Sequence, residues 1–491
     1  MKQLSRRTKT SLIIIGIIII LAAFILALTW WLSVTFGVSI REILYTLTSP
    51  LKGSDTHFLG SAVKFIVPWI LAALIICIII FVVRIKIEGK KEKTQKIFMR
   101  ILRIISALLL VASLIWCNIR LSIPSFVMAN IQSTEIYEDY YVDPDTVEIS
   151  SNGETKNIIY IYMESMENTY ASADVGGFQK DNNYIPNLTQ LAFDNVSFSN
   201  NSQLGGFYSG TGMGWTIAAL LATTAGVPFS FPTKNNSMNN REHFAAGITT
   251  LGDILKEKGY YQEFLCGSDS EFGGRYSYFT QHGGYEIFDY NTAIDRGYID
   301  KDYKVWWGFE DAKLYDIAKD ELTRISQLDQ PFNFTMLTVD THHIDGYVCD
   351  LCEDEYGTQL ANVVACADRQ IYEFIDWCKQ QDFYDDTVII ITGDHPRMDT
   401  SLVNKADPRT VYNCFINTAC PEPARTTNRT FTSVDLFPTI LSSMGFSIEG
   451  NRLGLGTNMF SCLDTLPEQM GLDKFNDELG RYSIYYIENF S

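Results

Sequence analysis

Histidine is scarce in this chain, with six residues among 491, and basic residues are scarce in its last three quarters. Residues 1–124 contain 16 Lys and Arg and 4 Asp and Glu, a net charge of +12. The whole chain has 39 Lys and Arg and 57 Asp and Glu. Residues 125–491 are therefore left with 23 basic and 53 acidic residues, a net charge of −30. So acidic a region argues against nucleic acid as a partner, because phosphate backbones bind basic surfaces.

Charge is nearly absent from two apolar stretches that are long enough to cross a membrane, residues 11–36 and 58–83. A third candidate, residues 101–123, is shorter and bracketed by Arg103 and Arg120. A cleaved signal peptide is the alternative for the first stretch, but its apolar run is too long and shows no clear small-residue cleavage site. We therefore expect a transmembrane region over residues 1–124, a linker over 125–154 and a separate domain over 155–491.

The basic residues predict the orientation of these spans. The N-terminus carries four Lys and Arg, and the loop between the second and third spans carries seven, whereas the loop between the first and second has only Arg41 and Lys52. Cytoplasmic loops are enriched in Lys and Arg. Three crossings from a cytoplasmic start predict a multi-pass protein of the cytoplasmic membrane whose large domain is extracytoplasmic.

A second Cys-x-x-Cys pair is also absent. Eight of the ten cysteines follow residue 124, and Cys349 and Cys352 form one such pair, but no partner pair follows at zinc-ribbon spacing. The sequence therefore disfavours a metal site there. We expect instead a disulfide from Cys366 to Cys349 or Cys352, because these cysteines flank the polar insertion CEDEYGTQL in an oxidising compartment.

Short β-branched and aromatic runs alternate with helical patterns in the large domain. The expected strands are 157–163, 260–266, 332–339 and 387–392, and the expected helices include 252–258, 310–326 and 360–381. This alternation predicts an α/β fold with a central, mainly parallel sheet.

A glycine-rich loop leads into an alanine- and leucine-rich helical stretch in residues 205–228, GGFYSGTGMGWTIAALLATTAGVP. Thr216 is predicted at or near the N-terminus of this helix, where free backbone N–H groups and the helix dipole favour a phosphoryl group. The glycine spacing is neither the Walker pattern nor the dinucleotide fingerprint. Threonine is also a common helix cap, so this stretch alone leaves a nucleophile and a cap both open.

Three predicted strands end in residues that can bind a metal. Glu164 follows the first, Asp340-Thr341-His342-His343 follows the Phe332 strand, and Gly393-Asp394-His395 ends the last. The carboxyl ends of parallel strands line one crevice. Singly these residues could be helix caps or hydrogen-bonded histidines, but half of the histidines lie in two of these exits. Together they predict a divalent metal held by Glu164, Asp394 and His395, with Thr216 as the remaining ligand and the nucleophile.

Several motifs together resemble the phosphoglycerol transferases of the sulfatase and alkaline-phosphatase superfamily. They are NIIYIYMES, GTGMGWTIAALLATTAGVP, TLGDILKEKGY, TVDTHH, TVIIITGDH and a late GLG, spread over about residues 155–460. The likeness is nearest to the type I enzymes that decorate membrane-derived periplasmic glucans, and lipoteichoic acid synthases are more distant. The resemblance implies an alkaline-phosphatase/sulfatase-like domain that takes glycerol phosphate from phosphatidylglycerol through a threonine-bound intermediate, with Mn²⁺ or Mg²⁺.

The resemblance also implies roles for individual residues. The family's metal site matches Glu164, Thr216, Asp394 and His395, with Thr216 as the nucleophile. His342 matches a histidine near the substrate phosphate, where it would serve as general acid or base, and His343 adjoins it in the substrate site. Arg275 in FGGRYSYF matches a basic substrate-binding position.

The partners that this resemblance implies are phosphatidylglycerol, the lipid bilayer and a glycan or polyglycerol-phosphate acceptor. A phosphoethanolamine transferase is the enzymatic alternative, because it shares the threonine, the metal and the topology. A catalytically silent, membrane-anchored binding module is the alternative from another class. Sulfatase activity is disfavoured, since CPEPAR at residues 420–425 is one residue too long, and too late in the chain, for a formylglycine precursor.

Overall fold

The computed structural model describes residues 4–35, 40, 43–44, 57–151, 153, 155–230, 244–398, 401–403, 408–421 and 423–490. The chain divides into two compact units, Met1–Ile43 with Asp55–Val127, and Leu44–Ser54 with Met128–Ser491. Lys2, Arg41 and Lys52, which entered the orientation argument, and residue 36 at the end of the first predicted span lie outside the described residues.

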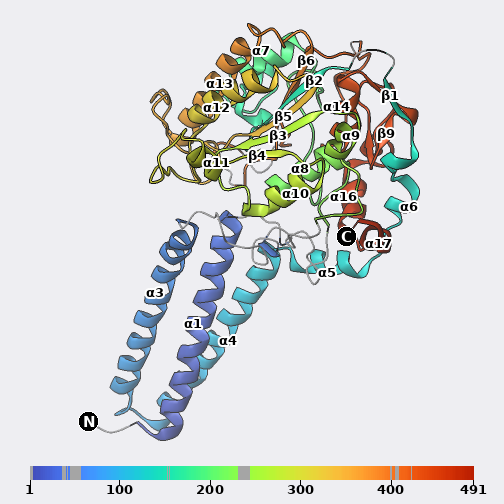
Figure 1. Cartoon of the computed structure of the whole chain (residues 1–491). Helices are drawn as coiled ribbons and strands as arrows, with labels where there is room; N and C mark the ends of the chain where they lie inside the picture. Colours follow the sequence, from blue (N-terminus) through green and yellow to red (C-terminus); the bar gives the residue numbers. More distant parts are fainter. Residues whose placement is uncertain are drawn as a thin grey trace. The chain divides into compact units, whose positions relative to one another are not determined.

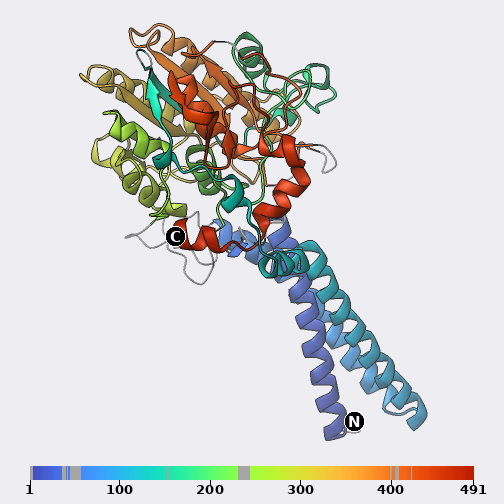
Figure 2. The same cartoon turned by 90° about the vertical axis from the view of Figure 1, so that its right-hand side faces the viewer.

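The N-terminal unit is built from long apolar helices, α1 (Arg6–Thr35), α3 (His57–Ile87) and α4 (Glu92–Arg120), followed by α5 (Ile123–Ile131). All three long helices are long and apolar enough to cross a membrane. They run alongside one another in Figure 1 and Figure 2, and Ile15 and Ile19 of α1 share a small core with Ala73 of α3 and Met99 of α4. The helix that contains most of the third predicted span runs from Glu92 to Arg120, because the charged residues before the span are also helix-forming.

A six-stranded sheet forms the centre of the second unit. Its strands, in order across the sheet, are β4 (Glu286–Phe288), β3 (Tyr261–Cys266), β5 (Phe332–Leu337), β2 (Asn157–Met163), β6 (Thr387–Gly393) and β7 (Asn413–Ile416). All neighbouring pairs are parallel except β6 and β7. The predicted mainly parallel sheet is therefore confirmed, and its four predicted strands are β2, β3, β5 and β6.

Helices cover both faces of this sheet (Figure 1). They are α7 (Pro186–Asp194), α8 (Thr216–Ala225), α9 (Leu251–Glu257), α10 (Arg275–Gln281), α11 (Tyr290–Asp295), α12 (Asp311–Ile325), α13 (Gln359–Cys378) and α14 (Leu436–Ser443). Alternate residues of β2 enter opposite cores, Tyr160 on the side of α8, α9, α10 and α14, and Ile161 on the side of α7, α12 and α13. A sheet buried on both faces favours strands rich in apolar and aromatic residues, although β3 and β5 also bury Gln262 and Asn333.

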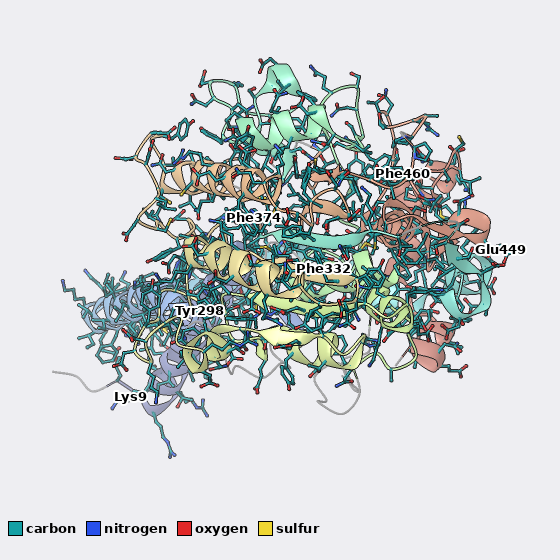
Figure 3. All side chains as sticks on the ribbon, turned by 45° about the horizontal axis from the view of Figure 1, so that its top comes forward. Lys9, Tyr298, Phe332, Phe374, Glu449 and Phe460 are labelled. Atoms are coloured by element: carbon teal, nitrogen blue, oxygen red, sulfur yellow. The ribbon has the colours of Figure 1, made fainter. Side chains whose placement is uncertain are left out.

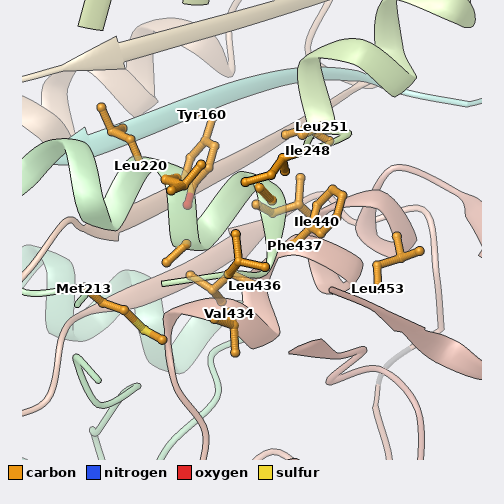
Figure 4. Close-up of a cluster of buried hydrophobic side chains, with 14 of the residues drawn as sticks. Tyr160, Met213, Leu220, Ile248, Leu251, Val434, Leu436, Phe437, Ile440 and Leu453 are labelled. Carbon is orange, nitrogen blue, oxygen red and sulfur yellow. The ribbon is translucent and has the colours of Figure 1, made fainter. Parts of the chain in front are cut away.

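Each core joins helices that are distant in the sequence. Figure 4 shows Tyr160 of β2 in the first core with Leu220 of α8 and Ile440 of α14. Phe332 of β5 and Phe374 of α13, both labelled in Figure 3, belong to the second core. The two cores fix the helices against the sheet and so determine where the loops at its carboxyl edge lie.

The segment predicted as a linker, 125–154, has regular structure and belongs to the second unit from Met128 onward. It contains α6 (Ile136–Tyr140) and β1 (Ile149–Ser151), and β1 pairs with β8 (Phe446–Ile448). Tyr137 of α6 is buried against the rings of Tyr486 and Phe490 in the last helix, α17 (Ile484–Phe490). These helical and strand residues were not predicted, because most of the segment is polar and only a few of its side chains are buried.

The remaining elements are short. They include β9 (Arg452–Leu453), β10 (Gly456–Thr457), α15 (Leu466–Met470), α16 (Leu472–Gly480) and the 3₁₀ turn η6 (Phe272–Gly274).

Candidate active site

Three predicted metal ligands meet at the carboxyl edge of the sheet. Glu164 directly follows β2, and Asp394 and His395 directly follow the neighbouring strand β6. All three side chains are buried, and each places a ligand atom within 4.8 Å of the others. The parallel pairing of β2 with β6 therefore brings together residues that are separated by more than two hundred positions in the sequence.

The hydrogen bonds of His395 determine which ring nitrogen faces the carboxylates. Nδ1 lies 3.0 Å from the carbonyl oxygen of Pro396, which can only accept a hydrogen bond, so the ring proton is assigned to Nδ1. Nε2 lies 3.3 Å from Oδ2 of Asp394 and 3.9 Å from Oε1 of Glu164. The lone pair of Nε2 and two carboxylates thus converge on one point, as in metal sites whose histidine is oriented by a backbone carbonyl.

The electrostatics of this point favour a cation. Burial, and after it the negative charge of Glu164, raises the pKa of Asp394. Oδ2 of Asp394 is buried and has no hydrogen-bond partner among the described residues. Because two buried carboxylates repel each other without a counter-charge, the donor set fits a divalent cation.

Thr216 is the first residue of α8, as the sequence indicated. The N-cap of this helix is Trp215, with extended backbone, and Gly226 ends the helix in the left-handed conformation at φ 67°. The Thr216 side chain is half-buried, and its hydroxyl makes no hydrogen bond within the described part of the chain. Thr216 is therefore not the capping residue, and its hydroxyl is available for chemistry. Its role as ligand and nucleophile stays a prediction.

His342 and His343 follow β5, the strand on the other side of β2. Their rings stack with centroids 4.7 Å apart, and the His342 ring lies 5.0 Å from the ring of Trp307. Nδ1 of His342 donates to the carbonyl of His343, which leaves Nε2 able to accept a proton. Burial lowers the pKa of His342 to about 4, and the positive charges of Arg397 and His395 act in the same direction. His342 is thus a neutral imidazole at physiological pH.

Arg275 begins α10 and is directed into its own loop. Its guanidinium donates to the carbonyls of Phe272 and Asp269 at 3.1 and 2.9 Å, and two of its five N–H donors are used in this way. Phe272 packs on Trp307, which in turn packs on His342. The loop that carries Arg275 is therefore connected to the β5 exit by aromatic contacts, and direct substrate binding by Arg275 stays a prediction.

Comparison with known proteins identifies the family. The sulfatase family model matches residues 156–446. The chain belongs to the sulfatase family. Phosphoglycerol transferase I of Xanthomonas campestris pv. campestris is 33% identical over 315 residues, 62% of this chain and 43% of the relative. The enzyme of the same name from Salmonella choleraesuis is 30% identical over 321 residues, 62% of this chain and 39% of the relative. The chain thus matches less than half the length of these curated relatives.

Two solved structures share the fold of this sulfatase-family chain. One is a protein of the alkaline phosphatase superfamily from Vibrio parahaemolyticus, with a TM-score of 0.51, 22% identity and coverage of 67% of this chain and 76% of that chain. The other is a lipoteichoic acid synthase from Listeria monocytogenes, with a TM-score of 0.50 and 19% identity. The match covers 66% of this chain and 81% of that chain. The superfamily expected from the sequence motifs is confirmed.

Sequence reasoning missed Arg397, a buried arginine two residues after His395. Its guanidinium donates to the carbonyl of Thr341, so it joins the loop after β6 to the loop after β5. Its backbone N–H donates to Glu167, whose buried carboxylate also pairs with Arg409. The run GDHPR contained the signal, since a basic residue two positions after the predicted metal ligand His395 is well placed to bind an anion.

Ser165 was also missed. Its hydroxyl donates to Oε1 of Glu164 at 2.6 Å, and its backbone N–H donates to Oδ1 of Asp394 at 2.8 Å. A small residue after a strand-terminal acid is too common to reveal this contact from the sequence.

The structure brings together the three cysteines of the predicted disulfide. Sγ of Cys349 lies 3.7 Å from Sγ of Cys352 and 3.8 Å from Sγ of Cys366, and all three are free thiols. The predicted disulfide from Cys366 to Cys349 or Cys352 is therefore absent from the structure, although the sulfurs lie next to one another. At these distances the sulfurs are in contact without a bond between them.

Proposed function

We propose that this chain is a membrane-anchored, metal-dependent phosphoglycerol transferase. It takes glycerol phosphate from phosphatidylglycerol and passes it to a glycan or polyglycerol-phosphate acceptor through a phosphodiester on Thr216. The proposal is supported by the likeness to enzymes named phosphoglycerol transferase I and by three helices long enough to cross a membrane. The observation that carries it is the convergence of Glu164, Asp394 and Nε2 of His395 at the carboxyl edge of the sheet.

The residues that would hold the metal are Glu164, Asp394, His395 and Thr216. Bound there, a divalent cation supplies charge neutralisation for the phosphodiester and for the threonine oxygen. Thr216 lies in the first turn of α8, where backbone N–H groups have no partner within the helix. These N–H groups favour a negatively charged phosphoryl group next to the Thr216 hydroxyl.

The transfer consists of two displacements. In the first, Oγ1 of Thr216 gives up its proton and forms a bond to phosphorus while the bond from phosphorus to the diacylglycerol oxygen breaks. That oxygen takes up a proton, so one proton is released and one is consumed. In the second, an acceptor hydroxyl forms the new bond to phosphorus, the bond to Oγ1 breaks, and Thr216 regains its proton. Nε2 of His342 is the group we assign to receive the acceptor's proton, because its lowered pKa keeps it unprotonated.

The membrane helices fit a lipid donor. Eleven Lys and Arg are found in the N-terminal segment and in the loop between the second and third spans, so we place both in the cytoplasm. The sulfatase-family unit then lies outside, where phosphatidylglycerol of the outer leaflet and envelope glycans are accessible.

Product analysis tests this function. The full-length protein is incubated with Mn²⁺ and vesicles that contain either labelled phosphatidylglycerol or labelled phosphatidylethanolamine, with a soluble glucan as acceptor. We expect diacylglycerol and glycerol-phosphate-modified glucan from the first lipid only, and neither product from an Asp394→Asn variant. Turnover of phosphatidylethanolamine instead identifies a phosphoethanolamine transferase, and turnover of neither lipid, with or without acceptor, identifies a binding module.

A further inference from the structure

A second group of potential metal ligands lies apart from Glu164, Asp394 and His395. Cys349 and Cys352 lie in the segment between β5 and α13, where the N–H of Cys352 donates to the carbonyl of Cys349 at 3.0 Å. Cys366 comes from the second turn of α13. The three sulfurs lie within 4.8 Å of one another, and the Cys349 and Cys366 side chains are buried whereas Cys352 is half-buried.

The spacing of the sulfurs matches that of a tetrahedral thiolate site. In a regular tetrahedron with zinc–sulfur bonds of about 2.3 Å, neighbouring sulfurs are about 3.8 Å apart. The sulfur of Cys349 lies 3.7 Å from that of Cys352 and 3.8 Å from that of Cys366. A disulfide requires about 2.05 Å and leaves the third cysteine without a partner, whereas one metal ion uses all three.

The neighbouring amide supports negatively charged sulfurs. Nε2 of Gln370, one turn after Cys366 on α13, donates to Sγ of Cys366 at 3.3 Å and to Sγ of Cys349 at 3.8 Å. Oε1 of the same amide is buried and has no hydrogen-bond partner among the described residues. An amide that directs its donor to two sulfurs at the expense of its acceptor is the arrangement expected around thiolates, because thiolates accept N–H bonds more strongly than thiols.

We propose that Cys349, Cys352 and Cys366 bind one zinc ion. Within the described residues the cluster offers three protein ligands, so a solvent molecule on the half-buried side of Cys352 completes the fourth position. Three thiols lose their protons when the ion binds. The sequence disfavoured a metal here because no second Cys-x-x-Cys pair follows, but the third ligand is a single cysteine from a helix.

The zinc ion would fasten the histidine loop to α13. The loop from Asp340 to Cys352 carries His342 and is closed by the N–H of Tyr347, which donates to the carbonyl of Asp340 at 2.7 Å. Gln359 of α13 donates to the carbonyl of Gly346 at 2.8 Å. The thiolate cluster adds a second attachment at the end of the loop, so the ion positions His342 without touching substrate.

The test uses the full-length protein purified without chelator, with cobalt as a spectroscopic substitute for zinc. We expect bound zinc that is lost in Cys366→Ala, and an intense thiolate-to-cobalt charge-transfer absorption in the cobalt-loaded wild type. Glu164, Asp394 and His395 contain no sulfur and cannot produce this absorption. Cys378→Ala is the matched control, because it removes another buried sulfur from the same helix outside the cluster and should keep the absorption.

Two results would overturn the proposal. One is a cobalt spectrum without charge-transfer absorption in wild-type protein whose thiols are free. The other is a disulfide between any two of the three cysteines in protein purified without reductant, detected by peptide mapping. If Cys366→Ala misfolds, a Cys352→Ser variant still tests the proposal, because it leaves the buried helix α13 unchanged. It should weaken zinc binding while the circular dichroism spectrum stays that of the wild type. The site does not depend on the transferase activity proposed above.

Discussion

The backbone N–H of Ser165 donates to Oδ1 of Asp394 at 2.8 Å, across the pair of strands β2 and β6. Its hydroxyl donates to Oε1 of Glu164 at 2.6 Å, so one residue orients both carboxylates. Ser165 also has positive φ, 53°. Carboxylates that ligate metals are commonly held by such hydrogen bonds.

The Ser165→Ala substitution should therefore weaken metal binding without unfolding the protein. Loss of the hydroxyl frees Oε1 of Glu164 to rotate, and we expect affinity for Mn²⁺ to fall by about 10- to 100-fold. Calorimetric titration of the metal-free protein measures this change. Ser165→Gly removes the same hydroxyl while relieving the positive φ, so it should lose the same affinity. Unchanged affinity in both variants would show that the hydroxyl does not orient the ligand.

Thr216→Ala should fold but lose transfer almost completely. The hydroxyl makes no hydrogen bond in the described part of the chain and Trp215 is the N-cap, so the loss of stability should be smaller than the cost of about 1 kcal/mol of removing a cap. Thr216→Ser should retain some turnover. Mass spectrometry of wild-type protein given phosphatidylglycerol without acceptor should find glycerol phosphate on the peptide that contains Thr216.

Thr211→Ala is the matched control for this variant. Thr211 lies in the same glycine-rich loop, where its backbone N–H, and not its hydroxyl, is held by Asn476 at 2.9 Å. It should keep transfer activity. Near-normal transfer by Thr216→Ala, with the metal site intact, would rule out the threonine intermediate.

The sequence predicted the elements whose side chains are buried on both faces. The four predicted strands correspond to β2, β3, β5 and β6, because runs of six or seven residues rich in apolar and aromatic side chains are typical of buried parallel strands. β4 and β7 were missed, since edge strands of three and four residues are too short to show a pattern. α6 was missed because only Ile136 and Tyr137 of its five residues are buried.

The candidate site was predictable only where a residue adjoins a strand. Glu164, Asp394 and His395 each follow a strand, and sheet topology alone brings them together. Arg397 acts through hydrogen bonds to other segments, from its guanidinium to the carbonyl of Thr341 and from its backbone N–H to Glu167. Such contacts depend on side-chain direction in the folded chain, which no spacing along the sequence encodes.

The pH dependence of transfer should reveal the lowered pKa of His342. Because burial lowers the pKa of His342 to about 4, its neutral form persists well below the ordinary histidine pKa of about 6.5. At saturating metal we therefore expect no loss of kcat from this group between pH 7 and 5. Since the unfolded chain binds this proton at higher pH than the folded one, the contribution of His342 to stability is present above about pH 6.5 and is lost as pH falls toward 4.

Replacement of Arg397 tests whether its positive charge contributes to the lowered pKa of His342. The charge of Arg397 disfavours protonation of His342, so Arg397→Gln should move the acidic limb of the kcat profile to higher pH, whereas Arg397→Lys keeps the charge and should move it less. Thermal unfolding of both variants controls for the loss of the hydrogen bond to Thr341. An acidic limb near pH 6.5 in the wild type would contradict the assignment of His342.

The glycines that precede α8 should differ sharply in their tolerance of a methyl group. A Cβ at Gly206 would lie 1.8 Å from the carbonyl oxygen of Val411, whose N–H is bonded to Phe207, so the backbone itself must move. At Gly214 the nearest atom would be Oγ of Ser209 at 3.7 Å, an ordinary contact. We expect Gly206→Ala to destabilise the protein by at least about 1–3 kcal/mol and Gly214→Ala by less than about 0.5 kcal/mol.

Thermal unfolding of the two purified variants, compared with the wild type at the same detergent and metal concentrations, measures this difference. If both variants unfold at the wild-type temperature, the close approach of the loop to Val411 is not present in solution. Gly214→Ala also separates fold from function, because it leaves the packing intact two residues before Thr216. A loss of transfer in this variant without a loss of stability is the result expected when a phosphodiester binds closely against the backbone of the loop, since within the protein the added methyl group makes only an ordinary contact.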